Sequence, residues 1–455
     1  MLAAGQTTTG KAGAAPRAAA VDVRRFIDEH PVGRYQLLVA ALCAAIVVID
    51  GFDAQVMGFV APALSADLDI PRIALGAVIS SGTFGMMIGA LVFGPLADRF
   101  GRKPVLVACV LTFGAGSLLT STASSIAQLT SFRVMTGLGM GGAMPNAIAL
   151  TSEYMPSRSR NAAVMTMFCG FSFGSACAGW LAAAVVRRFG WQSVFVVGGL
   201  APIVFAAILI ALLPESIRFL VLARGRQERV RRYLARIAPG TPVPDEVVAG
   251  EPEHRVSASS VPELFAGGRA PVTLLLWTMF FMNLLNLWFL NNWLPIVLHD
   301  AGLSIETASV ITSLFQVGGL VGALLLAAVV GPRVSFRVLA AIYLAATICI
   351  LLIGEAGASV PLLIVSVFAA GLGVIGGQTM SNALAADFYP TPIRATGVGW
   401  ALGVGRIGSI LGPILGGLLL SYGGDARRVF WAASAPALIA TAAAFAASAG
   451  SRKPE

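Results

Sequence analysis

The sequence predicts an all-α membrane protein with twelve transmembrane helices, and its composition, its apolar segments and its charge distribution each support this class. Hydrophobic residues make up 57% of the 455 residues and charged residues only 12%, with a mean hydropathy of +0.82. A soluble domain is far less apolar. A span needs about 20 apolar residues, and such segments recur along the chain. The expected spans are residues 35–60, 73–97, 105–122, 126–150, 161–185, 192–213, 272–297, 307–330, 335–353, 361–386, 395–421 and 428–449.

The distribution of basic residues predicts the orientation of these spans. If the N-terminus is cytoplasmic, most of the 31 Lys and Arg residues fall in segments on the cytoplasmic side, as the positive-inside rule requires. The net charge of +9 therefore indicates membrane orientation rather than a nucleic-acid partner. Residues 1–34 lack the compact apolar core of a secretory signal. We expect a multi-pass protein of the inner (plasma) membrane with both termini in the cytoplasm.

A polar stretch at residues 214–271, rich in Arg, Pro and Glu, divides the chain into two halves of six spans. We interpret it as a cytoplasmic linker between residues 35–213 and 272–449, with cytoplasmic tails at 1–34 and 450–455. The segment 137–164 matches 371–398, and an acid, a proline and an arginine recur in register at the end of the span. The match predicts pseudo-symmetric halves with a substrate site between them near the middle of the membrane.

The loop "GPLADRFGRKPVL" at 94–106 resembles the signature loop of the major facilitator superfamily. Gly94 and Gly101 permit a tight turn, and Asp98 can lie at a helix terminus or pair with an arginine. The basic residues of the loop are Arg99, Arg102 and Lys103. The resemblance implies a major facilitator fold in which this loop latches the two halves on the cytoplasmic face. The corresponding segment 329–339 lacks the acid, so we expect a weaker latch there.

Three further stretches resemble the aromatic acid:H⁺ symporter family within that superfamily. They are "DGFD" at 50–53, "NNWLPIVLHDAG" at 291–302 and "RATGVGWALGVGRIGSILGPILGG" at 394–417. The resemblance implies proton-coupled uptake of a small aromatic carboxylate by alternating access. The expected partners are that acid and the lipid bilayer, and no obligate protein partner is evident. The coupling ion is H⁺, with no other cofactor.

Asp50 and Asp53 lie in the middle of the first apolar span. The strongly apolar residues of that span contribute about 4 kcal/mol to insertion, whereas two central carboxylates cost about 5 to 7 kcal/mol. The acids must therefore face protein or water, or become protonated. Their i, i+3 spacing puts them on nearly one helix face, where like charge and low dielectric favour the protonated form of at least one. We expect the pair to carry the coupling proton; a structural pair satisfied by hydrogen bonds is the alternative.

Arg133 and Arg406 are basic residues inside expected spans. Because arginine does not readily lose its charge, each should point at a partner or a polar cavity. Arg406 aligns with Ser172 in the internal repeat, so the repeat does not require an arginine there. We expect Arg406 to bind the substrate carboxylate through a forked pair of hydrogen bonds. Arg133 is expected to gate the passage or pair with an acid, with a structural salt bridge as the alternative.

The seventh span is rich in amide and aromatic side chains. Amides there could bond a ring hydroxyl while aromatic side chains stack on the ring. Interhelical hydrogen bonds and an interfacial aromatic belt are the alternatives. The candidate substrate residues are Asn283, Asn286, Trp288, Phe289 and Trp293, with Gln378 and Asn382 of the tenth span as weaker candidates.

We expect the charged residues at the ends of the two repeated spans to gate the passage rather than to bind substrate, because each acid precedes a proline and an arginine. We expect them to form cytoplasmic salt bridges that break and form during transport. These charged residues are Glu153, Arg160, Asp387 and Arg394.

Enzymatic activity is not expected. The five cysteines fall inside spans without the spacing of a disulfide framework or a metal cluster, and no catalytic triad or nucleotide motif is present. Three alternatives to aromatic acid uptake stay open at this point. They are a proton-driven exporter, a carrier of aliphatic or sugar acids, and a membrane sensor of aromatic acids that performs no net transport.

Overall fold

Long helices dominate the computed structural model, which describes residues 21–222, 227–241, 247–248, 261–330, 335–357, 359–390, 393–422 and 425–450. Parts of the two expected tails and of the linker, and residues 331–334 of the second-half loop, lie outside the described residues. The first group of six long helices comprises α2 (Arg34–Asp67), α3 (Arg72–Phe100), α4 (Arg102–Ser121), α5 (Ile126–Tyr154), α6 (Ser157–Phe189) and α7 (Gln192–Leu212). The second comprises α10 (Ala270–Asp300), α11 (Ile305–Val330), α12 (Phe336–Glu355), α13 (Val360–Phe388), α14 (Arg394–Ser421) and α15 (Ala426–Gly450).

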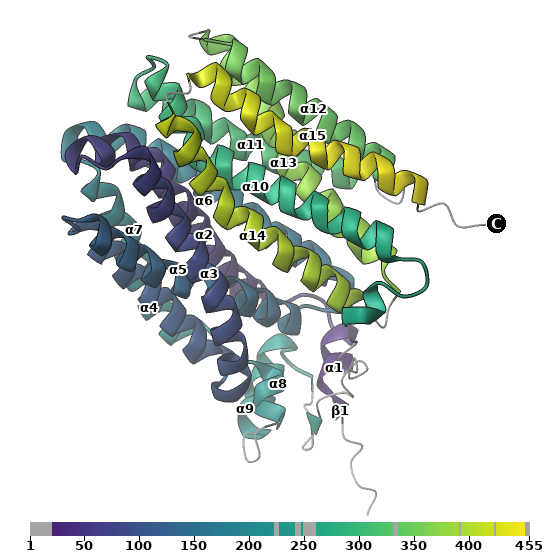
Figure 1. The fold of residues 1–455 in the computed structure, drawn as a ribbon. Coiled ribbons are helices and arrows are strands. Elements are labelled where there is room, and N and C mark those ends of the chain that lie inside the picture. The colour runs from purple at the N-terminus through teal and green to yellow at the C-terminus, as the bar shows by residue number, and fades with distance from the viewer. Residues whose placement is uncertain are drawn as a thin grey trace, which may run out of the picture.

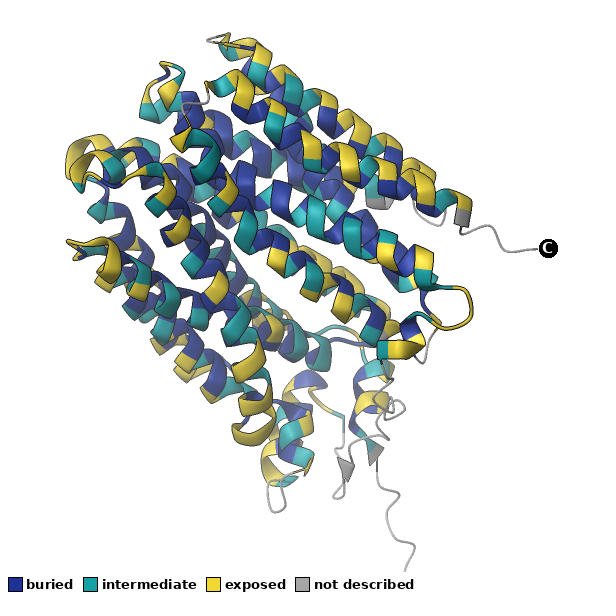
Figure 2. Ribbon diagram, viewed as in Figure 1, coloured by how far each residue is buried: buried dark blue, intermediate teal, exposed yellow. Residues whose placement is uncertain are grey.

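The expected all-α membrane fold with two similar six-helix groups is confirmed. Within the described residues, 11 helices are long and apolar enough to cross a bilayer. The other long helix, α5, has 29 residues and packs between α3 and α4 inside the first group. Bulky apolar side chains such as Leu91 and Phe445 are about two-thirds exposed or more, and Figure 2 shows many exposed residues on the outward faces of the helices. Lipid explains an apolar surface of this kind.

Close helix contacts repeat in the two groups and confirm the internal duplication. A Cβ atom at Gly137 of α5 would overlap the Gly82 carbonyl of α3, and one at Gly371 of α13 would overlap the Phe315 carbonyl of α11. The glycines of the facing helices repeat in the same way. Gly85 and Gly89 lie against the carbonyls of Val134 and Leu138, and Gly318 and Gly322 against those of Phe368 and Leu372. The small residues let the helix backbones touch.

The two groups meet along α3 and α14, α6 and α11, and α2 and α10, with α4, α7, α12 and α15 on the outside (Figure 1). Hydrogen bonds between the groups lie from the middle of α2 toward the end where α2 finishes and α3 begins, and we call this end the sealed end. Gln55 Nε2 donates to the Asn291 carbonyl at 2.6 Å and Ser80 Oγ to the Ile410 carbonyl at 2.7 Å. Arg72 also pairs with Asp300 there at 2.9 Å.

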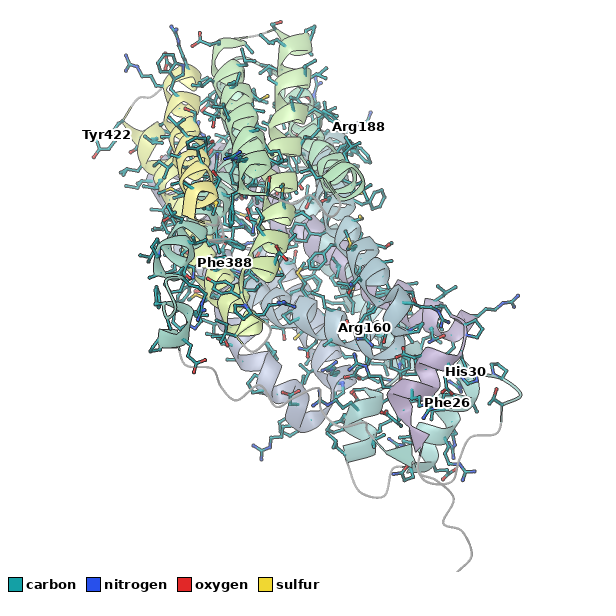
Figure 3. The ribbon with its side chains drawn as sticks, turned by 90° about the vertical axis from the view of Figure 1, so that its right-hand side faces the viewer. Phe26, His30, Arg160, Arg188, Phe388 and Tyr422 are labelled. Carbon is teal, nitrogen blue, oxygen red and sulfur yellow. The ribbon has the colours of Figure 1, made fainter. Side chains whose placement is uncertain are left out.

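Short elements cover the other end of the first group, which we call the α1 end. They are α1 (Val23–Glu29), α8 (Ile217–Leu222), α9 (Gln227–Ile237) and the parallel two-residue strands β1 (Val21–Asp22) and β2 (Val247–Val248), while η1 (Val261–Leu264) precedes α10. Figure 3 shows Phe26, His30 and Arg160 toward this end and Arg188 and Tyr422 toward the other. The sequence analysis had not identified this cap.

The cap is fastened to the bundle through Asp28 of α1. Its carboxylate accepts hydrogen bonds from the backbone N–H of Ser157 at 2.6 Å and from the Ser157 hydroxyl at 2.7 Å, at the start of α6. Partial burial raises the pKa of Asp28, but these hydrogen bonds and the charge of Arg160 outweigh it, so the pKa lies below its usual value. The apolar faces of α1 and α9 join the core of the first group.

Candidate functional site

Asp53 of α2 and Arg133 of α5 form a buried ion pair in the first group. Arg133 Nη2 lies 3.1 Å from Asp53 Oδ2, and the two side chains are 5% and 0% exposed. A hydrogen bond joins Arg133 Nη1 to Asp53 Oδ1 at 3.4 Å. The guanidinium also lies 5.8 Å from the centre of the Phe195 ring, within cation–π range. Arg133 thus has the acidic partner that its position in a span demands.

Asp50 is fully buried, and neither of its carboxyl oxygens has a hydrogen-bond partner among the described residues. It lies within electrostatic reach of Arg406, which α14 brings in from the second group. Arg406 itself is only partly buried. Gly51 fits closely against α6, because a Cβ there would overlap the Phe171 carbonyl. The gap left by Gly51 is therefore filled by another backbone.

The amide residues of α10 separate into partnered and unpartnered groups. Asn283 Nδ2 donates to Gln378 Oε1 at 2.8 Å, and Gln378 Nε2 donates to Asn382 Oδ1 at 3.2 Å. This chain of amides joins three of the predicted residues across α10 and α13. Asn286 is buried, and neither polar atom of its side chain has a partner within the described residues. Asn286 is thus the better placed of the predicted α10 amides to bind a further polar group.

The predicted aromatic residues of α10 take different places. Trp293 is fully buried, and its indole N–H donates to the Pro413 carbonyl of α14 at 2.9 Å. Phe289 is 3% exposed and belongs to the same apolar core as Trp293. Both side chains therefore pack in an apolar core that contains residues of both groups, whereas Trp288 lines a small cavity between the groups.

That cavity lies between α2, α3, α5 and α10. Its polar lining comes from Arg133, Thr83 and Asn292. Asn292 belongs to the amide-rich seventh span whose amides were expected to bond a ring hydroxyl, although it was not among the candidates selected from that span. The sequence analysis did not select Thr83, which resembles any other hydroxyl residue of an apolar helix.

The signature loop contacts elements of the first group. Arg102 Nη1 lies 2.7 Å from Glu153 Oε1 at the end of α5, and Ser216 Oγ donates to Glu153 Oε2 at 2.6 Å. Glu215, which precedes α8, accepts hydrogen bonds from the backbone N–H groups of Arg102 and Lys103 at 2.7 and 3.1 Å. A carboxylate at a helix N-terminus is stabilising. The expected latching of the two halves by this loop stays a prediction.

The remaining gating candidates lie near the surface. Asp98, Asp387 and Arg394 are exposed, and the Arg99 guanidinium lies over the Phe100 ring. Arg160 Nε donates to the Ser152 carbonyl at 3.1 Å and Arg394 Nε to the Tyr389 carbonyl at 3.3 Å. The two repeated arginines therefore make similar bonds to backbone carbonyls.

Replacing Gly101 with Ala should destabilise the α3–α4 junction. Gly101 has φ +100° and ψ +157°, a region nearly closed to other residues, and a Cβ there would overlap the Glu215 carboxylate that caps α4. We expect a loss of about 2–4 kcal/mol in the free energy of unfolding from strain and a disturbed charged cap. Thermal unfolding of the detergent-solubilised protein measures it. Gly94→Ala is the matched control, since a Cβ at Gly94 meets nothing within 4 Å. Equal stability of the two variants would contradict the backbone strain and the Glu215 overlap that we infer at Gly101.

Two similar groups of six membrane helices, with ionisable residues buried near their junction, define a secondary transporter. Residues 43–274 and 276–455 match the family model of the Major Facilitator Superfamily. The chain belongs to the Major Facilitator Superfamily, and it is an integral membrane protein.

Relatives of known activity cover nearly the whole chain. The 4-hydroxybenzoate transporter PcaK of Pseudomonas aeruginosa is 43% identical over 94% of this chain and 96% of its own length. The gallate transporter of Pseudomonas putida is 41% identical over 94% of this chain and 95% of its own length. The resemblance to aromatic acid transporters is thus confirmed.

The fold is also found in solved structures of distant sequence. A bacterial homologue of the human lysosomal transporter Spinster, in an inward-facing and occupied conformation, matches with a TM-score of 0.73. It is 17% identical, and the match covers 92% of this chain and 98% of that one.

Proposed function

We propose that this protein takes up a small aromatic carboxylate together with protons by alternating access. The names of the relatives supply the substrate class, since both carry a hydroxylated aromatic acid. We also propose that the protein lies in the inner membrane with both termini in the cytoplasm. This orientation rests on the basic residues of the loops. Exposed arginines of α9, including Arg229 and Arg232, lie at the α1 end.

One observation carries the proton coupling: four ionisable side chains lie close to the junction of the two groups and balance in charge. Asp53 is paired with Arg133, and Asp50 faces the field of Arg406. With both acids ionised the four side chains have no net charge. Entry of a carboxylate anion would leave an uncompensated negative charge in a region of low dielectric, which is costly. A proton taken up by one acid restores the balance, so anion and proton should enter together.

Asp50 is the acid we assign to this proton. Neither of its oxygens has a partner among the described residues, whereas Arg133 stabilises the carboxylate of Asp53. A neutral carboxylic acid tolerates a buried, unpartnered position far better than a carboxylate does. Protonation would also free Arg406 from the field of Asp50, so that its guanidinium can bind the substrate carboxylate.

Proton coupling also gives the uptake a driving force. A potential that is negative inside opposes the entry of an anion by about 2.3 kcal/mol per 100 mV. One accompanying proton removes this opposition, and a second turns the potential into a driving force. In our proposed orientation the sealed end faces outward. Outward opening must then break the Gln55–Asn291, Ser80–Ile410 and Arg72–Asp300 contacts.

Purified protein in liposomes tests the function directly. We expect radiolabelled 4-hydroxybenzoate to accumulate when the outside is more acidic than the lumen, and the accumulation to collapse with a protonophore. Protein-free liposomes and an aliphatic acid of similar size are the controls. Uptake that ignores the pH gradient would contradict proton coupling. Binding without uptake would indicate a sensor, and preference for the aliphatic acid would identify a carrier of another class.

A further inference from the structure

The small cavity between the two groups combines a buried donor and a buried acceptor. Arg133 and Asn292 both line it. Arg133 Nε and Asn292 Oδ1 are both buried, and neither has a hydrogen-bond partner among the described residues. An unsatisfied buried polar atom is destabilising, so a pair of them beside one cavity calls for an explanation.

The orientation of the Asn292 amide is fixed by its own helix. Asn292 Nδ2 donates to the Trp288 carbonyl at 2.8 Å. Because a carbonyl oxygen can only accept, the amide nitrogen must face Trp288, and Oδ1 is left as the free end of the side chain. Asn292 is 1% exposed. It therefore offers an acceptor, Oδ1, to whatever occupies the cavity.

The size of the cavity limits its occupant. It has free space for about one water molecule, which is also the size of a hydroxyl group and much less than that of an aromatic ring. The other lining side chains include Met57, Met86 and Met140, which are flexible and make favourable contacts with aromatic rings. Trp288 also borders the cavity, and at 9% it is slightly more exposed than Asn292.

We propose that this cavity is a socket for the ring hydroxyl of a hydroxylated aromatic acid. The inference rests on the proposed function. In the socket the hydroxyl donates its proton to Asn292 Oδ1 and accepts a hydrogen bond from Arg133. Without substrate, one water molecule can take the same place, and a hydroxyl that reproduces its hydrogen bonds can displace it without loss. The socket thus selects hydroxylated acids over unsubstituted ones, while the carboxylate binds elsewhere, at Arg406.

Competition binding to the detergent-solubilised protein tests the socket, with benzoate, 4-fluorobenzoate, 3-hydroxybenzoate and 4-hydroxybenzoate as ligands. Fluorine approaches a hydroxyl in size but has no proton to donate. We expect at least one hydroxybenzoate to bind about tenfold or more tightly than both benzoate and 4-fluorobenzoate. Asn292→Leu keeps the approximate volume and removes the acceptor, so this preference should fall below about threefold.

Asn146→Leu is the matched control. Asn146 is a buried amide whose Nδ2 also donates to the carbonyl four residues back, that of Gly142 at 2.8 Å, but it does not line the cavity. This variant should keep the wild-type preference. Hydroxybenzoates and benzoate binding alike to wild-type protein, or an unchanged preference in Asn292→Leu, would overturn the socket and leave the transport of aromatic acids intact. Wild-type protein that binds none of these acids would instead overturn the proposed function, and the socket with it.

Discussion

Asn in place of Asp50 or Asp53 should abolish the accumulation of 4-hydroxybenzoate driven by a pH gradient. At position 50, asparagine resembles the protonated acid in shape and cannot lose a proton, so the carrier can no longer return to its ionised state. At position 53 it leaves the charge of Arg133 uncompensated, so a substrate anion no longer needs a proton to restore the charge balance. Exchange of labelled for unlabelled substrate needs no net proton movement, and Asp50→Asn should retain it. Uptake and counterflow in the same proteoliposomes measure the two activities.

Asp53→Asn has a further consequence that Asp50→Asn lacks. It leaves Arg133 buried without its charged partner, and an uncompensated buried charge destabilises a protein by about 3–5 kcal/mol. Size-exclusion chromatography separates a folding defect from a coupling defect. Asp69→Asn is the matched control, because Asp69 is exposed and its φ of +49° is one that asparagine tolerates. Normal accumulation in both the Asp50 and the Asp53 variants would remove these acids from the mechanism.

The helices and their duplication could be predicted because their signals are local. Apolar length marks each span, and the matching segments 137–164 and 371–398 marked the repeat. The structure shows the physical reason for this match: the carbonyls of Gly82 and Phe315 leave no room for a side chain at Gly137 and Gly371. A contact that excludes every Cβ leaves a trace in the sequence that survives divergence of the surrounding apolar residues.

Partners within the site could not be predicted in the same way. Asp53 and Arg133 were each recognisable as a charge that needs compensation, but their pairing depends on the rotation of α2 and α5 about their axes. Trp293 illustrates the same problem. Its position in an amide-rich span suggested that it stacks on the substrate ring, yet the indole N–H donates a hydrogen bond to the Pro413 carbonyl. Which face of an apolar helix meets a neighbour is set by packing that hydrophobicity alone does not encode.

The loop at 94–106 shows how a motif can be read correctly while its contacts are not. Gly101 forms the expected turn, but Gly94 lies inside α3. The contacts of Glu215 and Ser216 with the neighbouring helix ends were not predicted. Both residues follow the last span of the first half, more than a hundred residues along the chain. A capping carboxylate supplied from so far away has no signature at the helix it caps.

Arg406→Lys should weaken the binding of 4-hydroxybenzoate by about tenfold or more. A guanidinium can bind a carboxylate through two parallel hydrogen bonds, whereas an ammonium acts as a point charge. Hydrogen bonds to charged groups contribute about 1.5–3 kcal/mol each, so losing one corresponds to about 10- to 150-fold in affinity. Equilibrium binding of the radiolabelled acid gives the dissociation constant.

The charge that lysine keeps makes this variant informative about mechanism. If Arg406 only balanced the charge of Asp50, lysine would replace it and affinity would stay near the wild-type value. If Arg406 forms a forked contact with the substrate, lysine lowers the affinity, whereas the dependence of binding on pH is retained. Arg428→Lys is the control, since the Arg428 side chain is 80% exposed. Unchanged affinity in Arg406→Lys would mean that another cation binds the substrate carboxylate. Arg133, the buried arginine of the described core, could then bind it.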